Sequence, residues 1–158
     1  MAIPVPPGWT TGPTSDGELL RATTTGARMS AALVPLTDPR RTIPQRVRQA
    51  AGGEPTVTTS YLDIPVGRAV LAQATAERAV AQLWLPLPES HDALVVEIVA
   101  DDPGHGAAAA HVVTEIGARL TREDTVVRRR GPISARTVAL CTAHEPAPAL
   151  PAVVGSDV

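Results

Sequence analysis

The stretch AVAQLWLPLPESHDALVVEIVA, residues 79–100, contains two apolar runs separated by a short polar break. Successive side chains of an extended chain point to opposite faces, so each run places apolar residues on both of its faces. Strands of this kind are typical of a sheet that is covered on both sides. The break, Glu-Ser-His-Asp at 89–92, has the length of a hairpin loop and is too short for a crossover helix. The stretch therefore predicts an antiparallel hairpin at the centre of a sheet, with helices above and below it.

Length and composition favour one domain, and the cysteine content fits a reducing compartment or indifference to redox. The chain has 158 residues, of which 44% are hydrophobic, enough for one core of ordinary size. Its net charge of -2 lacks the basic excess of most nucleic-acid-binding domains. The single Cys141 excludes an internal disulfide. Because the N-terminal MAIPVPPGWT has no signal-peptide pattern and no run is long enough to cross a bilayer, we expect a cytoplasmic protein without a membrane span.

Four further strands are expected before the central hairpin. Residues 18–24 and 29–36 flank a glycine-containing turn, and residues 56–64 and 68–75 flank Pro-Val-Gly at 65–67. The strand at 56–64 is rich in β-branched residues. Each pair predicts a hairpin.

Two helices are expected. Thr42 and Gln45 have the spacing of a capping box, which predicts a helix that begins at Thr42 and stops at the glycines of 52–53. Asp102 precedes Pro103, a favourable start for a second helix. The second helix carries a continuous apolar stripe made of Ala109, Val112, Val113, Ile116 and Leu120.

The order of these elements predicts an α+β fold, an antiparallel sheet of about six strands with helices packed on both faces. We expect residues 1–124 to form this domain. Residues 125–142 have the pattern of an additional β-hairpin or arm, and residues 143–158 form a Pro/Ala-rich flexible tail.

This element order, opened by Pro-Pro-Gly-Trp at 6–9, resembles the PsbP-like group, which includes Mog, the photosystem II extrinsic protein, LpqN-type lipoproteins and DcrB-type bacterial proteins. Further matching features are LDIPVGRA at 62–69, WLPLP at 84–88 and the closing amphipathic helix. The resemblance covers roughly residues 3–122. It implies an α-β-α sandwich and a non-catalytic binding role, in some bacterial relatives that of a chaperone or adaptor for secreted effectors. The group has no common catalytic residue. Because no leader pattern or lipid-anchor cysteine stands near the start of this sequence, we do not expect the location of the lipoprotein and lumenal members.

Motifs for catalysis or cofactor binding are absent from the sequence. There is no phosphate-binding glycine loop, no HExxH, no CxxC and no GxSxG, so we expect no cofactor and no enzyme activity. Asp101, Asp102 and His105 could supply ligands to a divalent metal at a helix start. The competing interpretation is that Asp102 caps the helix and Asp101 favours its dipole.

Two tryptophans and a run of arginines are further candidates for a structural or binding role. Trp84 fits a core position in the central hairpin and Trp9 a place at the domain edge. Residues 119–136 contain six arginines and two acidic residues on an otherwise acidic chain. The run 128–130 suits either binding of a phosphate or carboxylate or protection of an exposed strand edge by charge.

We therefore expect a non-catalytic protein-binding adaptor, chaperone or assembly subunit, and the resemblance implies a link to a bacterial secretion or injection system. The alternatives are a small metal-dependent enzyme that uses Asp101, Asp102 and His105, and binding of an anion or nucleic acid through the segment 119–136. The partner is expected to be a protein bound by the C-terminal segment, with backbone strand pairing for affinity and the arginines of 128–130 steering an acidic partner. The candidate partner-binding residues are Arg128, Arg129, Arg130, Arg136, Val138 and Leu140.

Overall fold

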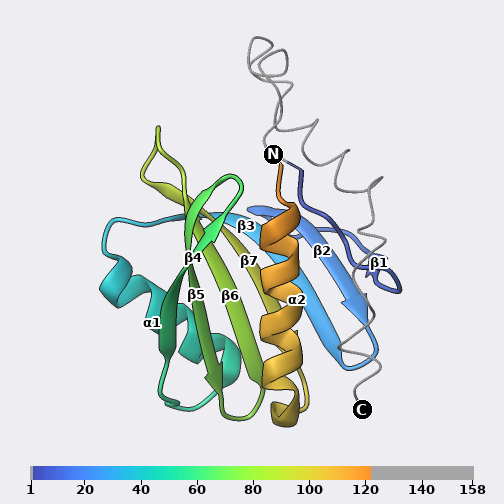
Figure 1. Ribbon diagram of the computed structural model, residues 1–158. Helices are drawn as coiled ribbons and strands as arrows, with labels where there is room; N and C mark the ends of the chain where they lie inside the picture. The colour runs from blue at the N-terminus through green and yellow to red at the C-terminus, as the bar shows by residue number, and fades with distance from the viewer. Residues whose placement is uncertain (1, 122–158) are drawn as a thin grey trace.

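The computed structural model describes residues 2–121 as an α+β fold with one seven-stranded antiparallel sheet and two α-helices (Figure 1). The strand order is β1-β2-β3-β7-β6-β5-β4. The strands are β1 Thr10–Thr11, β2 Glu18–Thr24, β3 Ala27–Pro35, β4 Thr58–Ile64, β5 Gly67–Thr75, β6 Ala79–Pro86 and β7 Asp92–Ala100; the helices are α1 Pro39–Ala51, the short 3-10 helix η1 Pro103–His105 and α2 Gly106–Arg119.

The predicted hairpin is present as β6 and β7, and it lies inside the sheet with two or more strands on either side. The two strands pair antiparallel from Ala79 opposite Ala100 to Pro86 opposite Ala93. Every residue of β6 except Pro86 is buried. The apolar character of both faces, visible in the sequence, thus corresponds to burial on both faces.

The hydrophobic core is divided by the sheet into two clusters. The α1 cluster joins Ile43 and Val47 of α1 to Trp84 of β6 and to further residues of β5 and β7. The α2 cluster joins α2 to the alternate strand residues, such as Leu83. Leu83 and Trp84 are neighbours in one strand and therefore point to opposite sides of the sheet. Figure 1 shows α2 in front of the strands and α1 behind β4 and β5.

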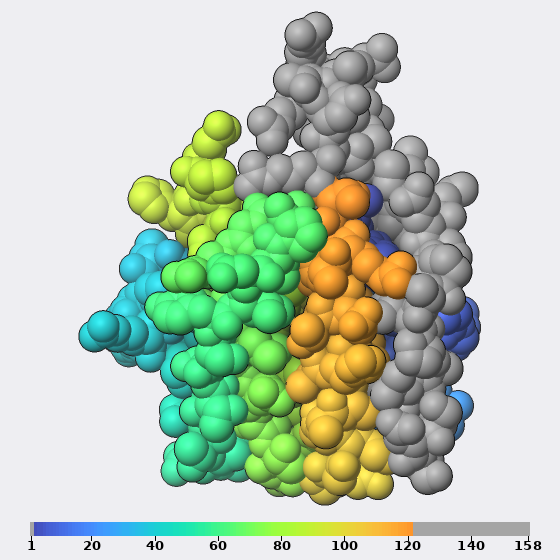
Figure 2. All heavy atoms as spheres, viewed as in Figure 1, coloured from blue at the N-terminus to red at the C-terminus, as the bar shows by residue number. Residues whose placement is uncertain are grey.

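The chain before β1 completes the α2 cluster. Ile3 and Val5 are buried in it, and Trp9 packs against it while remaining half-buried. Ala2 forms an isolated antiparallel bridge with Thr121, so the two ends of the described chain meet. In Figure 2, α2 runs beside the green surface of β4 and β5, in agreement with the contact of Gly117 with Ile64.

The predicted start of the first helix is wrong. The helix begins three residues earlier, at Pro39, with Asp38 as the N-cap residue, and Thr42 lies inside the first turn, where its N–H donates to the carbonyl of Asp38 at 2.9 Å. Pro39 occupies the first turn, where its missing N–H would have no helical partner in any case. Proline after a short polar residue therefore decided the start, and the capping-box spacing from Thr42 was coincidental.

The start of the second helical segment has the predicted cap. The carboxylate of Asp102 accepts a hydrogen bond from the N–H of Gly104 at 2.7 Å, and η1 leads directly into α2. All five residues of the predicted apolar stripe are buried. The sheet has one strand more than the approximate number expected, because the two-residue β1 pairs with β2 at one edge. Within residues 2–121 no helix has the length and apolar character needed to cross a membrane.

Candidate functional site

Strand β4 forms one edge of the sheet. It pairs with β5 along its whole length, from Thr58 opposite Gln73 to Ile64 opposite Gly67, and it is the last strand in the order found for the described residues. Its first four residues are all exposed. An edge strand of this length presents a row of backbone donors and acceptors to which another chain can pair.

The register identifies which backbone groups of β4 face outward. In the loop between β5 and β6 the N–H of Ala76 donates to the carbonyl of Arg78 at 3.1 Å. From this bond onward, hydrogen-bonded and non-hydrogen-bonded residue pairs alternate along the two strands β5 and β6. This alternation makes Val70 a residue whose backbone N–H and C=O bond to β6. Val70 therefore makes no backbone hydrogen bond to Tyr61, the residue opposite it on β4, and Tyr61 is not hydrogen-bonded to β5. The N–H and C=O groups of Thr59, Tyr61 and Asp63 therefore point away from the sheet.

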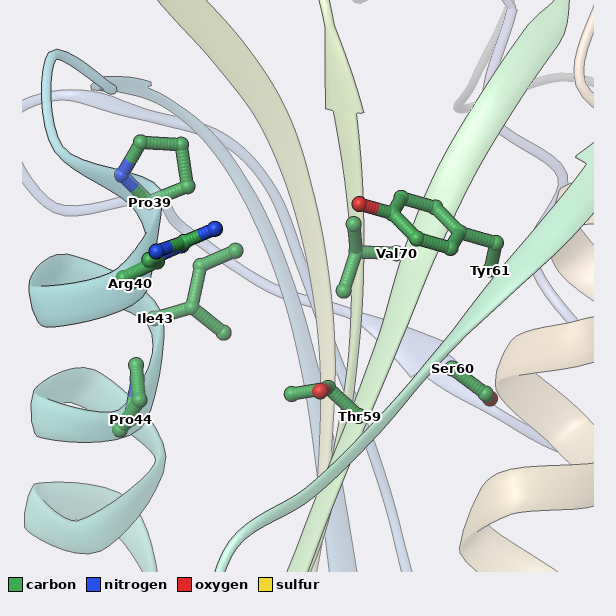
Figure 3. A pocket seen from close by; sticks show the side chains of 8 residues that line it. All are labelled: Pro39, Arg40, Ile43, Pro44, Thr59, Ser60, Tyr61 and Val70. Atoms are coloured by element: carbon green, nitrogen blue, oxygen red, sulfur yellow. The ribbon is translucent and has the colours of Figure 1, made fainter.

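A cleft of about 300 Å³ lies between α1 and the same strand (Figure 3). We call it the α1–β4 cleft. Figure 3 shows Ile43 pointing from the helix toward the strands and Val70 standing between them, with Thr59 and Tyr61 on the far wall. The lining residues are Pro39, Arg40, Ile43, Pro44, Thr59, Ser60, Tyr61 and Val70.

Tyr61 is the most exposed large apolar side chain in the described part of the chain, at 75% relative exposure. The guanidinium carbon of Arg68 lies 5.5 Å from the centre of its ring, within the range of a cation–π contact. Arg68 also donates to a carboxylate oxygen of Asp63 at 3.0 Å, and this hydrogen bond raises the pKa of Arg68. The Asp63 carboxylate at the edge is thus already paired with a cation.

The wall formed by α1 is strongly basic. Residues 39–51 contain four arginines and no acidic residue. Arg40 lines the cleft and points toward β4 and Tyr61 in Figure 3. Like Arg40, the other three arginines, Arg41, Arg46 and Arg48, are exposed on α1. The cleft therefore combines an apolar floor with a cationic rim.

Pro44 and Arg78 determine how α1 borders the cleft. Pro44 lies inside the helix and has no N–H to donate to the carbonyl of Arg40, one turn earlier. At the other end of the helix, Arg78 donates from Nε to the carbonyl of Ala50 at 2.8 Å and from its backbone N–H to Ala51 at 3.0 Å. The C-terminal end of α1 is thereby fixed to the turn between β5 and β6, while the first half carries the cleft residues.

The residues considered for a metal are not arranged as a ligand set. No group of three or more histidine, cysteine, aspartate or glutamate side chains within residues 2–121 could hold a metal ion. Asp102 uses its carboxylate as a cap, and His105 Nε2 lies 3.9 Å from Asp102 Oδ2. Asp101 is exposed, and its N–H donates to the carbonyl of Gly26.

The C-terminal residues assigned to partner binding, Arg128, Arg129, Arg130, Arg136, Val138 and Leu140, lie outside the described residues. Of the arginine-rich segment 119–136, only the beginning is described, with Arg119 in the last turn of α2. The division of the chain after residues 124 and 142 likewise remains a prediction.

The α1–β4 cleft was not predicted from the sequence. One signal was present, since Thr-Thr-Ser-Tyr at 58–61 places polar or amphipathic residues on both faces of a strand, which is typical of an edge. The arginines of α1 were a second signal. The sequence could not predict which helix would lie beside that edge, because α1 and β4 are joined by a loop whose path depends on the whole sheet.

Comparison with known proteins does not assign the chain to a group. No protein-family model matches the sequence, and no curated protein is similar enough to be matched with it.

Proposed function

We propose that this protein is a non-catalytic protein-binding domain, an adaptor, chaperone or assembly subunit, that pairs an extended segment of its partner with strand β4. The observation that carries the proposal is the outward orientation of the backbone groups of Thr59, Tyr61 and Asp63 next to a side-chain cleft. Strand addition uses this combination, since main-chain hydrogen bonds supply affinity and a pocket for alternate side chains supplies specificity.

The alternative of a metal-dependent enzyme has less support. The carboxylate of Asp102 is engaged as a helix cap, and no group of three or more potential ligand side chains within residues 2–121 could hold a metal ion. The α1–β4 cleft, in contrast, offers a hollow for recognition that is lined by apolar, hydroxyl and arginine side chains.

We extend the proposal to a PsbP-like α-β-α sandwich and to a role beside a bacterial secretion or injection system. Two observations support the sandwich: the order of strands and helices, and the separate clusters that α1 and α2 form with alternate residues of β6 and β7. The secretion-linked role is supported by the resemblance at residues 3–122.

A peptide-display selection with random heptamers tests the proposal. The baits are the wild type, Thr59→Pro, which removes an outward N–H without removing a β4–β5 hydrogen bond, and Thr59→Ala, which keeps the N–H and removes the side-chain hydroxyl. We expect a common motif to be enriched by the wild type and by Thr59→Ala and lost with Thr59→Pro, while all three baits keep similar melting temperatures. Enrichment of the same motif by Thr59→Pro, or of none by the wild type, would contradict strand addition.

A truncation distinguishes this edge from the C-terminal segment. Residues 3–120 supply both described clusters, so we expect a chain that ends at Asp124 to stay folded. If that chain selects the same motif, recognition lies at the β4 edge. Loss of the motif in a folded truncation would move recognition to residues 125–158, as the charge of that segment predicted.

A further inference from the structure

We infer that the segment bound at β4 is acidic, with a carboxylate two positions away from an apolar anchor residue that enters the α1–β4 cleft. This inference rests on the proposed strand addition and specifies the chemistry of the partner. It follows from the charges around the cleft and from the spacing of side chains along a strand. It also follows from the symmetry that a second copy of this chain would have if it paired at β4.

The charges on the α1 wall of the cleft are all positive. Arg40 lines the cleft, and Arg41 follows it on an α1 surface that contains no acidic residue. The acidic side chain of β4, Asp63, is paired with Arg68 at 3.0 Å, which reduces its repulsion of an incoming carboxylate. Asp38 precedes the helix, but the helix itself carries four positive charges. A segment with negative charge would therefore be attracted during encounter.

The geometry of strand pairing sets the pattern of the ligand. A strand added to β4 would continue the sheet, so every second side chain of the ligand would lie on the side of α1. One of these side chains would meet the floor formed by Ile43 and Val70. The next on the same side would lie two residues away, where the guanidinium of Arg40 is available at the rim. A volume of about 300 Å³ is at the lower limit of small-molecule sites, which suits a side chain better than a cofactor.

A second copy of this chain fits the same edge poorly. Antiparallel pairing of β4 with β4 of another copy would follow a two-fold axis perpendicular to the sheet, which leaves both α1 helices on the same side of the joint. Two surfaces with four arginines each would then flank one seam. Like charges placed opposite each other disfavour such a contact, whereas an acidic partner neutralises it.

The test begins with the heptamers selected by the wild type. We expect them to share a bulky apolar residue with Asp or Glu two positions away. A selected peptide labelled with fluorescein is then compared with its counterpart in which each Asp or Glu is replaced by Asn or Gln. Binding is measured by fluorescence anisotropy to the wild type, to Arg40→Gln and to Arg28→Gln, a control that removes one exposed arginine from β3.

We expect Arg40→Gln to weaken binding of the acidic peptide about threefold to tenfold and to reduce its dependence on salt, while Arg28→Gln leaves binding unchanged. The amide peptide should bind the wild type more weakly and should lose little further affinity with Arg40→Gln, because the interacting charge is already absent. Equal effects of Arg40→Gln on both peptides would overturn the inference.

The remaining outcomes separate this inference from the proposed function. If the wild type selects a neutral or basic motif that Thr59→Pro abolishes, strand addition holds and the acidic partner is wrong. If an oligothymidylate displaces the acidic peptide and binds more tightly than it does, the arginines serve a nucleic acid and the inference is overturned. If sedimentation shows a dimer that Thr59→Pro dissociates, the occupant is a second copy. Absence of any selected motif overturns both proposals.

Discussion

The indole N–H of Trp84 donates a hydrogen bond to Oε1 of Gln82, 2.9 Å away, with both side chains enclosed between α1 and the sheet. Gln82 in turn donates from Nε2 to Oε2 of Glu97, its cross-strand partner on β7, at 2.5 Å. Gln82 is the single buried polar or charged residue of the described chain. Its amide therefore joins a core tryptophan to a half-buried carboxylate, and it satisfies the polar atoms that this side of the core contains.

Gln82→Leu is expected to destabilise the fold. Leucine is similar in size but can neither accept from Trp84 nor donate to Glu97, so two polar groups would lose their partners. Leaving one buried donor unsatisfied costs about 1–3 kcal/mol. Urea unfolding should show a lower midpoint with an unchanged slope. Glu97→Gln is the control, since its amide oxygen can still accept from Gln82, and it should cost less. An unchanged urea midpoint in Gln82→Leu would mean that water replaces the lost partners.

Trp84→Ala should be one of the most destabilising single changes in the chain. Trp84 is fully buried and packs in the α1 cluster with residues of α1, β5 and β7. Deleting a buried tryptophan side chain costs about 3–5 kcal/mol, which is a large part of the stability of a domain. Urea or thermal unfolding followed by circular dichroism measures the loss. An almost unchanged midpoint would contradict the placement of this residue in the centre of the sheet.

Gly117→Ala tests the close approach of α2 to the sheet. A Cβ atom at this position would lie 2.8 Å from Cδ2 of Leu83 and 3.4 Å from Cγ2 of Ile64, and Leu83 is buried and has little room to move. Overpacking costs about 1–3 kcal/mol and outweighs the better helix propensity of alanine, about 1 kcal/mol. The thermal midpoint should therefore fall. Gly12→Ala, where a Cβ would have no neighbour within 4 Å, should leave the midpoint nearly unchanged.

The carboxyl group of Glu18 should make the fold sensitive to acid. A hydrogen bond from Nη2 of Arg21, 2.6 Å from Oε1, lowers the pKa of Glu18 in the folded state, and the N–H of Ser15 adds a second bond at 2.9 Å against an opposing effect of burial. A lowered folded pKa means that this contribution is present above the unfolded pKa, about 4.3, and is lost as the pH falls through the folded value.

Arg21→Gln checks this assignment. The pKa of Glu18, followed by carbon-detected NMR titration, should move up toward its ordinary value, and the decrease in stability on acidification should become shallower. Arg28→Gln, on the neighbouring strand, is the control and should leave the titration of Glu18 unchanged. A Glu18 pKa that stays low in Arg21→Gln would assign the effect to the Ser15 N–H alone.

The error at Thr42 shows how local signals compete. Thr42 with Gln45 and Asp38 with Pro39 are both recognised helix starts within five residues. Pro44 favoured the later start, because proline is better tolerated in a first turn than inside a helix. The structure accommodates Pro44 inside α1, where Ile43 and Val47 on either side of it are buried against the sheet. Burial of the apolar face outweighed the loss of one helical hydrogen bond.

What the sequence by itself determined was the α+β class, the central hairpin and the apolar stripe of α2, because each depends on side-chain periodicity within about twenty residues. Only the tertiary structure decided that β3 pairs with β7, from Ala27 opposite Ala100 to Pro35 opposite Asp92, and this pairing places β4 at the edge. It also decided that α1 stands beside β4, so that Arg40 and Tyr61 line one cleft. Contacts between such distant segments leave no periodic trace in the sequence, since they depend on which faces remain uncovered after the local elements have formed.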